Sequence, residues 1–376
     1  MPGCNVLVQP RRPRAQVLAG LLTLGLAGAL LGWLWQRQRP ITVAVGVDLP
    51  LVSGAAIDPS DRHTAELYLE ETPGSRIRLV NQLNAPDPAT APESIAALQR
   101  QGVRFFINTQ ASSHAVPSLP LFTDGQALAI NVSATSDRLS GRDDFFFRVV
   151  PDLVQEQRAL ARHLNTLPGG RLLVLQDTEN RAYTDPAFRV FAAELARADR
   201  WQIVRRPLRV SAFEPRRDRQ LLEGDVDALY LLAGSFVPVI GNISQLFHQL
   251  HPSAPIVLTP WARSPSILES AGPAARQILI ASPFPARDRD PRIDRYLQRF
   301  EQRFGYRPWA MSMSTRQAME ILDRALASGA STPAAVKRYL LGRREHPTSL
   351  GAVGFDANGD VQGRYHFIRP SAQALQ

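Results

Sequence analysis

The sequence of 376 residues contains one cysteine and one lysine. A single cysteine, Cys4, excludes a disulfide scaffold and any metal site that needs several cysteines. The lysine, Lys337, follows a valine, so the Gly-Lys pair of a phosphate-binding P-loop is absent. A kinase strand lysine or a Schiff-base lysine would have to be this same residue. These absences predict that ATP-driven phosphoryl transfer is not the function of this chain.

The signatures of other enzymes are missing as well. The sequence has no G-x-S-x-G elbow and no H-E-x-x-H motif. Ser112 would need a histidine base to act as a nucleophile, and His114 two residues along does not establish one. His248 and His251 have a metal-like spacing, but no Cys, Asp or Glu accompanies them in a ligand pattern, so we predict exposed helix histidines. We therefore expect a non-enzymatic protein without a metal or cofactor.

Acidic residues are absent from the first 40 positions, which hold five arginines. The whole chain has 43 basic and 34 acidic residues, for a net charge of +9, so more than half of the excess lies in this short stretch. The remaining arginines are spread thinly along the chain, without the clustered basic stripe that phosphate binding requires. The charge therefore does not predict a nucleic-acid partner.

The arginines at the N-terminus flank one long apolar run. Val17–Trp35 has Thr23 as its only polar side chain. As a helix it would span about 28 Å, close to the thickness of a bilayer core. Three arginines precede the run and two follow it, which places the N-terminus in the cytoplasm. An uncleaved signal anchor is the favoured interpretation, and a signal peptide cleaved at Ala27–Ala29 is the alternative. Either one exports everything after about Pro40.

Beyond Ile41, short β-branched runs alternate with helical patterns, which is typical of βαβ units and parallel sheets. About ten strands are too many for one compact sheet, and we therefore predict an α/β fold with two lobes. After Ala281 the pattern becomes helical, and Asn358-Gly359 predicts a terminal hairpin between Ala352–Phe355 and Arg364–Ile368. The expected strands are Thr42–Val47, Arg76–Val80, Arg104–Asn108, Leu128–Asn131, Phe145–Val149, Arg171–Leu175, Gln202–Val204, Ala228–Leu232, Ile256–Thr259 and Ile278–Ala281.

In open α/β sheets, ligands bind beyond the carboxyl ends of the strands. Thr109–Ser113 follows the third expected strand and Val132–Ser136 follows the fourth. Both segments are small and hydroxylated, and each precedes a helical pattern. Free backbone N–H groups with Ser and Thr hydroxyls form an anion site without a cation. The same residue types also serve as helix N-caps, so both interpretations stay open.

Four stretches carry a resemblance to a known family. They are Gly102–Ser113, Ala129–Ser136, Phe146–Gln155 and Gly354–Asp360. In their order and spacing, the sequence resembles the type I periplasmic binding proteins. The resemblance is to the branch that contains the leucine/isoleucine/valine-binding proteins of ABC importers. It covers nearly all of residues 41–369.

The resemblance implies two Rossmann-like lobes that close on a ligand and are joined by three crossovers. The crossovers are expected near Val150–Asp152, Ala281–Phe284 and Phe367–Pro370. The implied first lobe comprises residues 41–150 and 283–366, and the second comprises 151–282 and 367–376. Residues 1–40 would form the cytoplasmic tip with the signal anchor or signal peptide.

The resemblance also implies a ligand site. In the family a ligand carboxylate is held after the third and fourth strands, and a ring from the second lobe covers the ligand. Amino-acid-binding relatives carry an acid after a proline that matches Pro260, but here Trp261 follows it. An aromatic, urea-like, amide-like or purely carboxylate ligand is therefore as open as an α-amino acid. The positions implied in the site are Gln110, Ser112, Ser133, Ala134, Thr135, Tyr183 and Trp261.

The function implied is that of a solute-binding protein of an ABC importer. It would bind a small polar ligand between its lobes, and its partners would be an ABC permease and the ATPase subunit. It would lie in the periplasm, anchored in the inner membrane by the N-terminal helix. The alternative is a ligand-sensing receptor subunit of the same fold that acts through a partner protein.

Overall fold

The computed structural model describes residues 39–48, 59–84, 87–234, 239–371 and 374. The predicted membrane segment Val17–Trp35 lies outside these residues. Among the helices that the structure describes, none is long and apolar enough to cross a membrane. Thr42–Gln376 forms one compact unit that contains two sheets.

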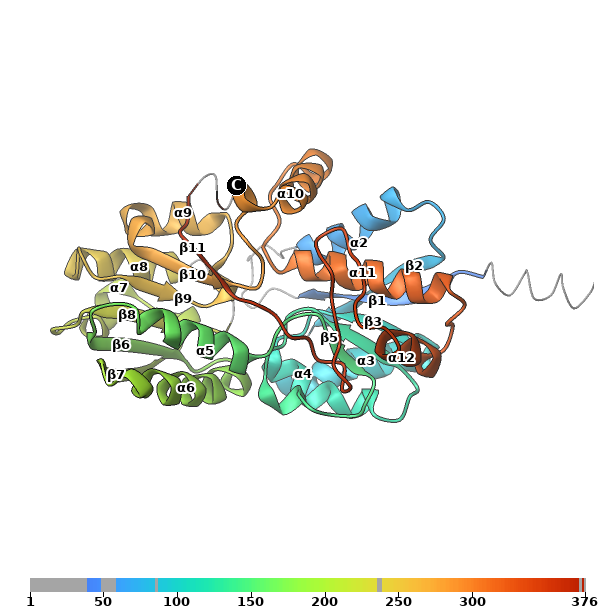
Figure 1. Ribbon diagram of the computed structural model, residues 1–376, viewed down its shortest axis with the longest axis horizontal. Helices are drawn as coiled ribbons and strands as arrows, with labels where there is room; N and C mark the ends of the chain where they lie inside the picture. The colour runs from blue at the N-terminus through green and yellow to red at the C-terminus, as the bar shows by residue number, and fades with distance from the viewer. Residues whose placement is uncertain (1–38, 49–58, 85–86, 235–238, 372–373, 375–376) are drawn as a thin grey trace, which may run out of the picture. The chain divides into compact units, whose positions relative to one another are not determined.

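The first sheet has five strands in the order β2-β1-β3-β4-β5 (Figure 1). The pairs β1–β3, β3–β4 and β4–β5 are parallel. β3 and β4 are buried at every residue, because helices cover both faces of a parallel sheet. On one face, Phe106 and Ala129 share a core with Ile95 and Ala115 from two helices. The strands are β1 (Ile41–Asp48), β2 (Ile77–Asn84), β3 (Phe105–Asn108), β4 (Leu128–Asn131) and β5 (Phe146–Arg148).

The helices of the first lobe come from two distant parts of the sequence. α11 packs against α2, although about 250 residues separate their first turns, and α11 is buried along nearly its whole length. Among the described residues, three α-helices come before the chain enters the second lobe, and three follow its return. They are α2 (Ser60–Glu71), α3 (Ala91–Arg100), α4 (Ser112–Ser118), α10 (Pro291–Phe304), α11 (Ser312–Ala327) and α12 (Pro333–Leu341).

The second sheet has six strands in the order β11-β10-β9-β8-β6-β7. Only β11 is antiparallel to its neighbour among the pairings described for this sheet. The strands are β6 (Gly170–Asp177), β7 (Trp201–Leu208), β8 (Ala228–Leu232), β9 (Ile256–Leu258), β10 (Ile278–Ser282) and β11 (His366–Ile368). The helices are α5 (Leu153–Leu164), α6 (Arg181–Leu195), α7 (Pro215–Asp218), α8 (Val239–Leu250) and α9 (Ser266–Ala271).

Alternation along β6 gives the second sheet two separate cores. Leu172 and Val174 face one core and Leu173 and Leu175 face the other, because successive side chains of a strand point to opposite faces. The first core is covered by α5 and α6, and the second by α8 and α9, as Figure 1 shows. This layering positions the carboxyl ends of the strands at one edge.

The strand positions expected from the sequence are confirmed, and β4 and β8 match residue for residue. The prediction of a terminal hairpin between Ala352–Phe355 and Arg364–Ile368 is wrong. Phe355 forms a bridge with Val361 across the turn at Gly359, whose φ of +83° suits glycine. The chain then leaves this turn, and His366–Ile368 pairs with β10 instead. A local turn signal could not reveal this long-range partner.

The chain passes between the two sheets three times within the described residues. The first passage follows β5 and the second follows β10. The third passage comes before Phe367–Pro370, where it was expected. Phe367 already lies in β11 of the second sheet, where it pairs with Ala281. The third passage runs beside the first passage, where Gln155 Nε2 donates to Val361 O at 3.0 Å and Tyr365 Oη donates to Pro151 O at 3.3 Å.

Arg148 joins three segments at the end of β5. Its side chain is fully buried and donates to Asp360 Oδ1 from Nε at 2.9 Å and from Nη2 at 2.5 Å. Nη1 donates to Ser136 O at 3.0 Å, and Nη2 also donates to Ser140 Oγ at 2.5 Å. The segment after β4, the end of β5 and the turn around Gly359 are therefore held by one guanidinium.

Candidate functional site

Two asparagines, Asn108 and Asn131, are the last residues of the neighbouring strands β3 and β4 and organise the carboxyl end of the first sheet. Asn131 Nδ2 donates to Asn108 Oδ1 at 2.6 Å. Asn131 Oδ1 accepts from the backbone N–H of Ser133 at 3.0 Å and of Ala134 at 2.5 Å. The loop after β4 is thus folded back onto the strand that precedes it.

Two serines connect this loop to the loop after β3. Ser112 Oγ accepts from the N–H of Thr135 at 3.2 Å and of Ser136 at 3.1 Å. Ser133 Oγ lies 2.9 Å from Thr109 O and 3.0 Å from Gln110 O. The structure therefore brings together the five first-lobe positions implied by the resemblance. They are Gln110, Ser112, Ser133, Ala134 and Thr135.

These contacts bear on the two interpretations of the hydroxylated loops. The backbone N–H groups expected to receive an anion are instead taken by Asn131 and Ser112. The capping interpretation holds for Ser136, whose side chain accepts from Arg138 N at the start of a short 3-10 helix. Ser112 caps no helix, because the N-cap position of α4 is Ala111.

Of the predicted first-lobe positions with a hydroxyl, which are Ser112, Ser133 and Thr135, only Thr135 has a hydroxyl without a partner among the described residues. Its Oγ1 is buried and makes no hydrogen bond with any residue that the structure describes. A buried hydroxyl left unpaired costs about 1–3 kcal/mol, so natural proteins rarely leave one without a function. Thr135 O accepts from Leu153 N at 2.8 Å, which connects the loop to the first helix of the second lobe. A role of Thr135 in ligand binding stays a prediction.

The two lobes touch where α4 and α6 begin. Asn180 Oδ1 accepts from Ser113 N at 3.0 Å and from Ser113 Oγ at 2.9 Å. Asn180 Nδ2 donates to Gly234 O at 2.7 Å, at the end of β8. Ser113 ends the hydroxylated segment Thr109–Ser113, which the sequence offered as a candidate binding loop. Asn180 was not predicted for the site, and its only sequence signal was its position before a helix that follows a strand.

Tyr183 is enclosed in the core of the second lobe. Its side chain is fully buried, and its hydroxyl donates to Glu156 Oε1 at 2.5 Å. Gln157 Nε2 donates to the same carboxyl oxygen at 2.9 Å. Burial raises the pKa of Glu156 to about 8, so this carboxyl is mainly protonated at neutral pH. A role of Tyr183 at the ligand stays a prediction, and only its ring is free of polar contacts.

The ring of Tyr183 leads to two tryptophans. It meets Trp261 edge-on at 6.0 Å between centroids, and Trp261 stacks on Trp309 of the first lobe at 6.4 Å. Trp309 Nε1 donates to Asp61 Oδ2 at 3.3 Å, whereas Trp261 Nε1 is buried without a partner among the described residues. The three rings form a row that extends from the second lobe to the first. We call Tyr183, Trp261 and Trp309 the aromatic row.

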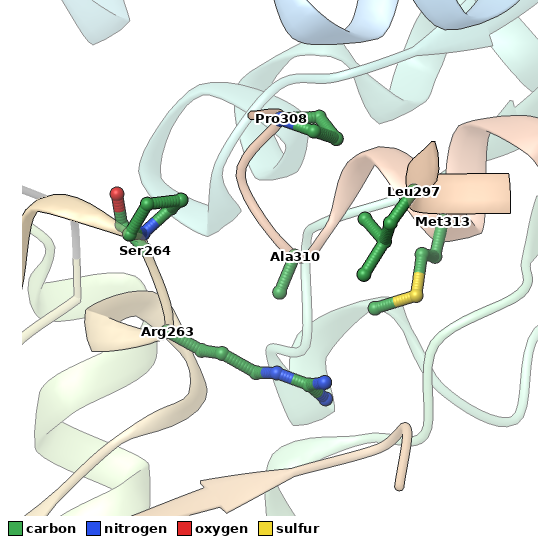
Figure 2. A pocket seen from close by; sticks show the side chains of 7 residues that line it. Arg263, Ser264, Leu297, Pro308, Ala310 and Met313 are labelled. Carbon is green, nitrogen blue, oxygen red and sulfur yellow. The ribbon is translucent and has the colours of Figure 1, made fainter. Parts of the chain in front are cut away.

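A pocket lies beside this row. The lining residues come from both lobes, and Arg263 reaches toward Ala310 and Met313, as Figure 2 shows. Arg263 is buried, and its guanidinium donates only to neutral oxygens of Ser282, Phe284 and Pro285. Burial lowers the pKa of Arg263 to about 9. The lining residues are Arg263, Ser264, Pro265, Leu297, Pro308, Ala310 and Met313.

The two histidines with metal-like spacing are not a site. His248 Nδ1 lies 2.5 Å from Gln277 Oε1, and His251 Nε2 lies 2.9 Å from Leu222 O. Both rings are half-buried, so the expectation of exposed histidines is wrong. Within the described residues, no group of three His, Cys, Asp or Glu side chains could hold a metal ion.

The described fold and site agree with a family match along almost the whole chain. The sequence model of the family described as periplasmic binding protein matches residues 41–374. The chain belongs to the periplasmic binding protein family. This periplasmic binding protein therefore binds a solute outside the cytoplasm and is not an enzyme. The resemblance stated from the four sequence stretches is confirmed.

Solved structures share this fold. The leucine-binding protein LivK from Thermotoga maritima is 19% identical, with a TM-score of 0.73 over 88% of this chain and 99% of its own. Two solute-binding proteins of ABC transporters come from Rhodopseudomonas palustris, and each is 15% identical. The complex with 3,4-dihydroxybenzoic acid has a TM-score of 0.74 and covers 87% and 93% of the two chains. The benzoate complex has a TM-score of 0.73 and covers 89% and 94%.

At these identities the likeness concerns the fold alone. Among curated proteins, this periplasmic binding protein has no match.

The unpaired hydroxyl of Thr135 predicts an unusual response to substitution. Thr135→Val should leave the free energy of unfolding of the ligand-free protein unchanged or raise it, because it removes a buried group without a partner. Thr259 is the matched control, since its buried hydroxyl donates to Ala233 O at 2.8 Å. Thr259→Val should lower the free energy of unfolding by about 1–3 kcal/mol. Urea unfolding measures both, and equal losses would show that Thr135 is an ordinary structural residue.

The raised pKa of Glu156 predicts a pH dependence of stability. In the unfolded chain this carboxyl loses its proton near pH 4.5, but in the folded protein only near pH 8. The folded state therefore binds more protons between these values, and stability falls as pH rises, by up to about 1.4 kcal/mol per pH unit. Glu156→Gln should flatten this decline in urea unfolding between pH 5 and 8.

The matched control for this pH dependence is Glu194→Gln. Glu194 pairs with Arg162 at 2.8 Å, and this contact lowers the pKa of its carboxyl. Its pKa is shifted in the opposite direction to that of Glu156, and the variant should keep the slope of the unmodified protein. If Glu156→Gln and the unmodified protein decline in parallel, Glu156 is ionised in the folded state.

Proposed function

We propose that this periplasmic binding protein captures a small solute that has a carboxylate and no amino group. It delivers this solute to an ABC permease with its ATPase subunit. The observation that carries the proposal is the aromatic row, in which Trp261 stands at the position where the resemblance implies an acid in amino-acid-binding relatives. An ammonium in a closed cleft requires an anionic partner, because an unpaired charge there is costly. Trp261 offers an aromatic face instead.

The buried acid at the edge of the second sheet supports this choice of ligand. Asp177 ends β6, and its carboxylate accepts from the N–H groups of Glu179, Val210 and Gly234. Three backbone donors already use three of the roughly four acceptor sites of this carboxylate, which leaves about one for a ligand ammonium. The hydroxyl of Thr135 and the rings of the aromatic row suit the carboxylate and the body of an aromatic acid.

Two of the similar structures make aromatic acids a concrete class to test. The proteins from Rhodopseudomonas palustris hold 3,4-dihydroxybenzoic acid and benzoate.

We propose that the solute is captured when the two lobes close on it. Contacts between Ser113 and Asn180, and between Trp261 and Trp309, join the lobes, and a ligand that binds only the closed form shifts the population toward it.

Calorimetry and thermal shift on the full-length protein test the ligand class. We expect benzoate and 3,4-dihydroxybenzoate to raise the melting temperature, and leucine to raise it less. Trp261→Phe should weaken benzoate binding, because a smaller ring covers less of the ligand. Trp201→Phe is the control, since Trp201 lies at the opposite end of the strands, at the start of β7. Tighter binding of leucine than of benzoate would overturn the proposed class.

We further propose that Val17–Trp35 remains attached and anchors the protein in the inner membrane. The run is long enough for a bilayer core, and its flanking arginines favour a cytoplasmic N-terminus.

Fractionation of expressing cells tests the anchor. The full chain should stay with membranes after a high-salt wash, and its intact mass should include the first residues. A chain from which residues 1–40 are replaced by a cleavable signal peptide is the control and should be soluble. A mature protein that begins just after Ala29 would contradict the anchor.

A permease and an ATPase that copurify with the protein would support import, whereas a copurifying kinase would support the sensing alternative.

A further inference from the structure

Three arginines are buried among the described residues, and one of them differs from the other two. Arg148 pairs with Asp360 at 2.5 Å. Arg316 pairs with Glu71 at 2.6 Å and with Glu320 at 2.7 Å. Arg263, which is 4% exposed, has no carboxylate partner in the part of the chain that the structure describes.

Arg263 lines the pocket and also contacts the second crossover between the lobes. The residue follows β9 and Trp261 at the carboxyl edge of the second sheet. Nη1 donates to Ser282 Oγ at 2.6 Å and to Phe284 O at 2.7 Å, and Nη2 donates to Pro285 O at 2.8 Å. A guanidinium has five N–H donors, so these three bonds leave donors for another acceptor.

The opposite wall of the pocket is apolar and belongs to the first lobe. Leu297 comes from α10 and Met313 from α11, and Pro308 and Ala310 lie between them. The two walls also meet through the backbone, because Ala310 N donates to Arg263 O at 3.2 Å. As Figure 2 shows, the Arg263 side chain extends toward this wall. An anion held here would contact a cation on one lobe and apolar groups on the other.

The energetics of Arg263 favour an anionic occupant. A buried guanidinium whose partners are all neutral has lost its hydration without gaining a counter-charge. Its lowered pKa reflects the same imbalance. A carboxylate would add charge-assisted hydrogen bonds, which are about twice as strong as bonds to neutral acceptors.

We propose that Arg263 forms a second anion subsite, so that the solute is a small aromatic diacid. This inference rests on the proposed function, and it narrows the ligand from an acid to a diacid. Because Arg263 is bonded to the second crossover, an anion at this subsite is connected to the segment that moves when the lobes close. Ligand charge and lobe closure would thus be coupled through one side chain.

Calorimetry on the full-length protein tests the subsite with three probes. They are terephthalate, its monoamide, which lacks the second charge, and benzoate. We expect terephthalate to bind about tenfold more tightly than the monoamide, a ratio that corresponds to about 1.4 kcal/mol. Arg263→Met should reduce that ratio to about one, and Arg263→Lys, which keeps the charge, should retain part of it. Arg289→Met removes an exposed arginine and should leave the ratio unchanged.

The outcomes separate this inference from the proposed function. A ratio near one in the unmodified protein, or a ratio that survives in Arg263→Met, would overturn the subsite. If Arg263→Met weakens all three probes equally, Arg263 acts only on the crossover. If benzoate binds and terephthalate does not, only the subsite fails. If none of the three probes binds, the subsite and the aromatic-acid ligand both fail.

Discussion

The contact on which the rest of the structure depends is the buried pair of Arg148 and Asp360. It lies where the chain leaves the first sheet, and the same guanidinium also holds the loop after β4 through Ser136 and Ser140. Removing one partner of a buried ion pair typically costs about 3–5 kcal/mol, because the other charge is left uncompensated. The pair therefore fixes the first passage between the lobes, the third passage beside it and the ligand loop as one unit.

Around this unit, polar groups fall into two kinds. Most are satisfied inside the protein, as with Asn131, which accepts two N–H groups of the loop that follows it. A few are not: the Thr135 hydroxyl and the Trp261 indole N–H are buried without partners among the described residues, and Arg263 lacks a counter-charge there. Buried polar atoms in other parts of the described chain, such as Ser94 Oγ and Asn165 Oδ1, are also unpaired, so Thr135 and Trp261 are distinguished by their place at the predicted ligand site.

Much of the fold could be predicted from the sequence, because short buried strands separated by helices have a local pattern. β4 and β8 were placed to the residue for this reason. Long-range partners could not be predicted: Asn358-Gly359 indicates a turn, but nothing nearby shows that His366 pairs with Ser282.

The site was predictable in the same limited way. The loops after β3 and β4 followed from strand order and resemblance, whereas the internal use of their N–H groups depends on Asn131 and Ser112 in three dimensions. Arg263 was missed because burial without a counter-charge has no sequence signature.

Native mass spectrometry of the protein purified from its own cells shows whether this site takes a carboxylate solute without an amino group, since a closed cleft retains its ligand. We expect a small organic acid to be retained, and a retained α-amino acid would contradict the proposed ligand class.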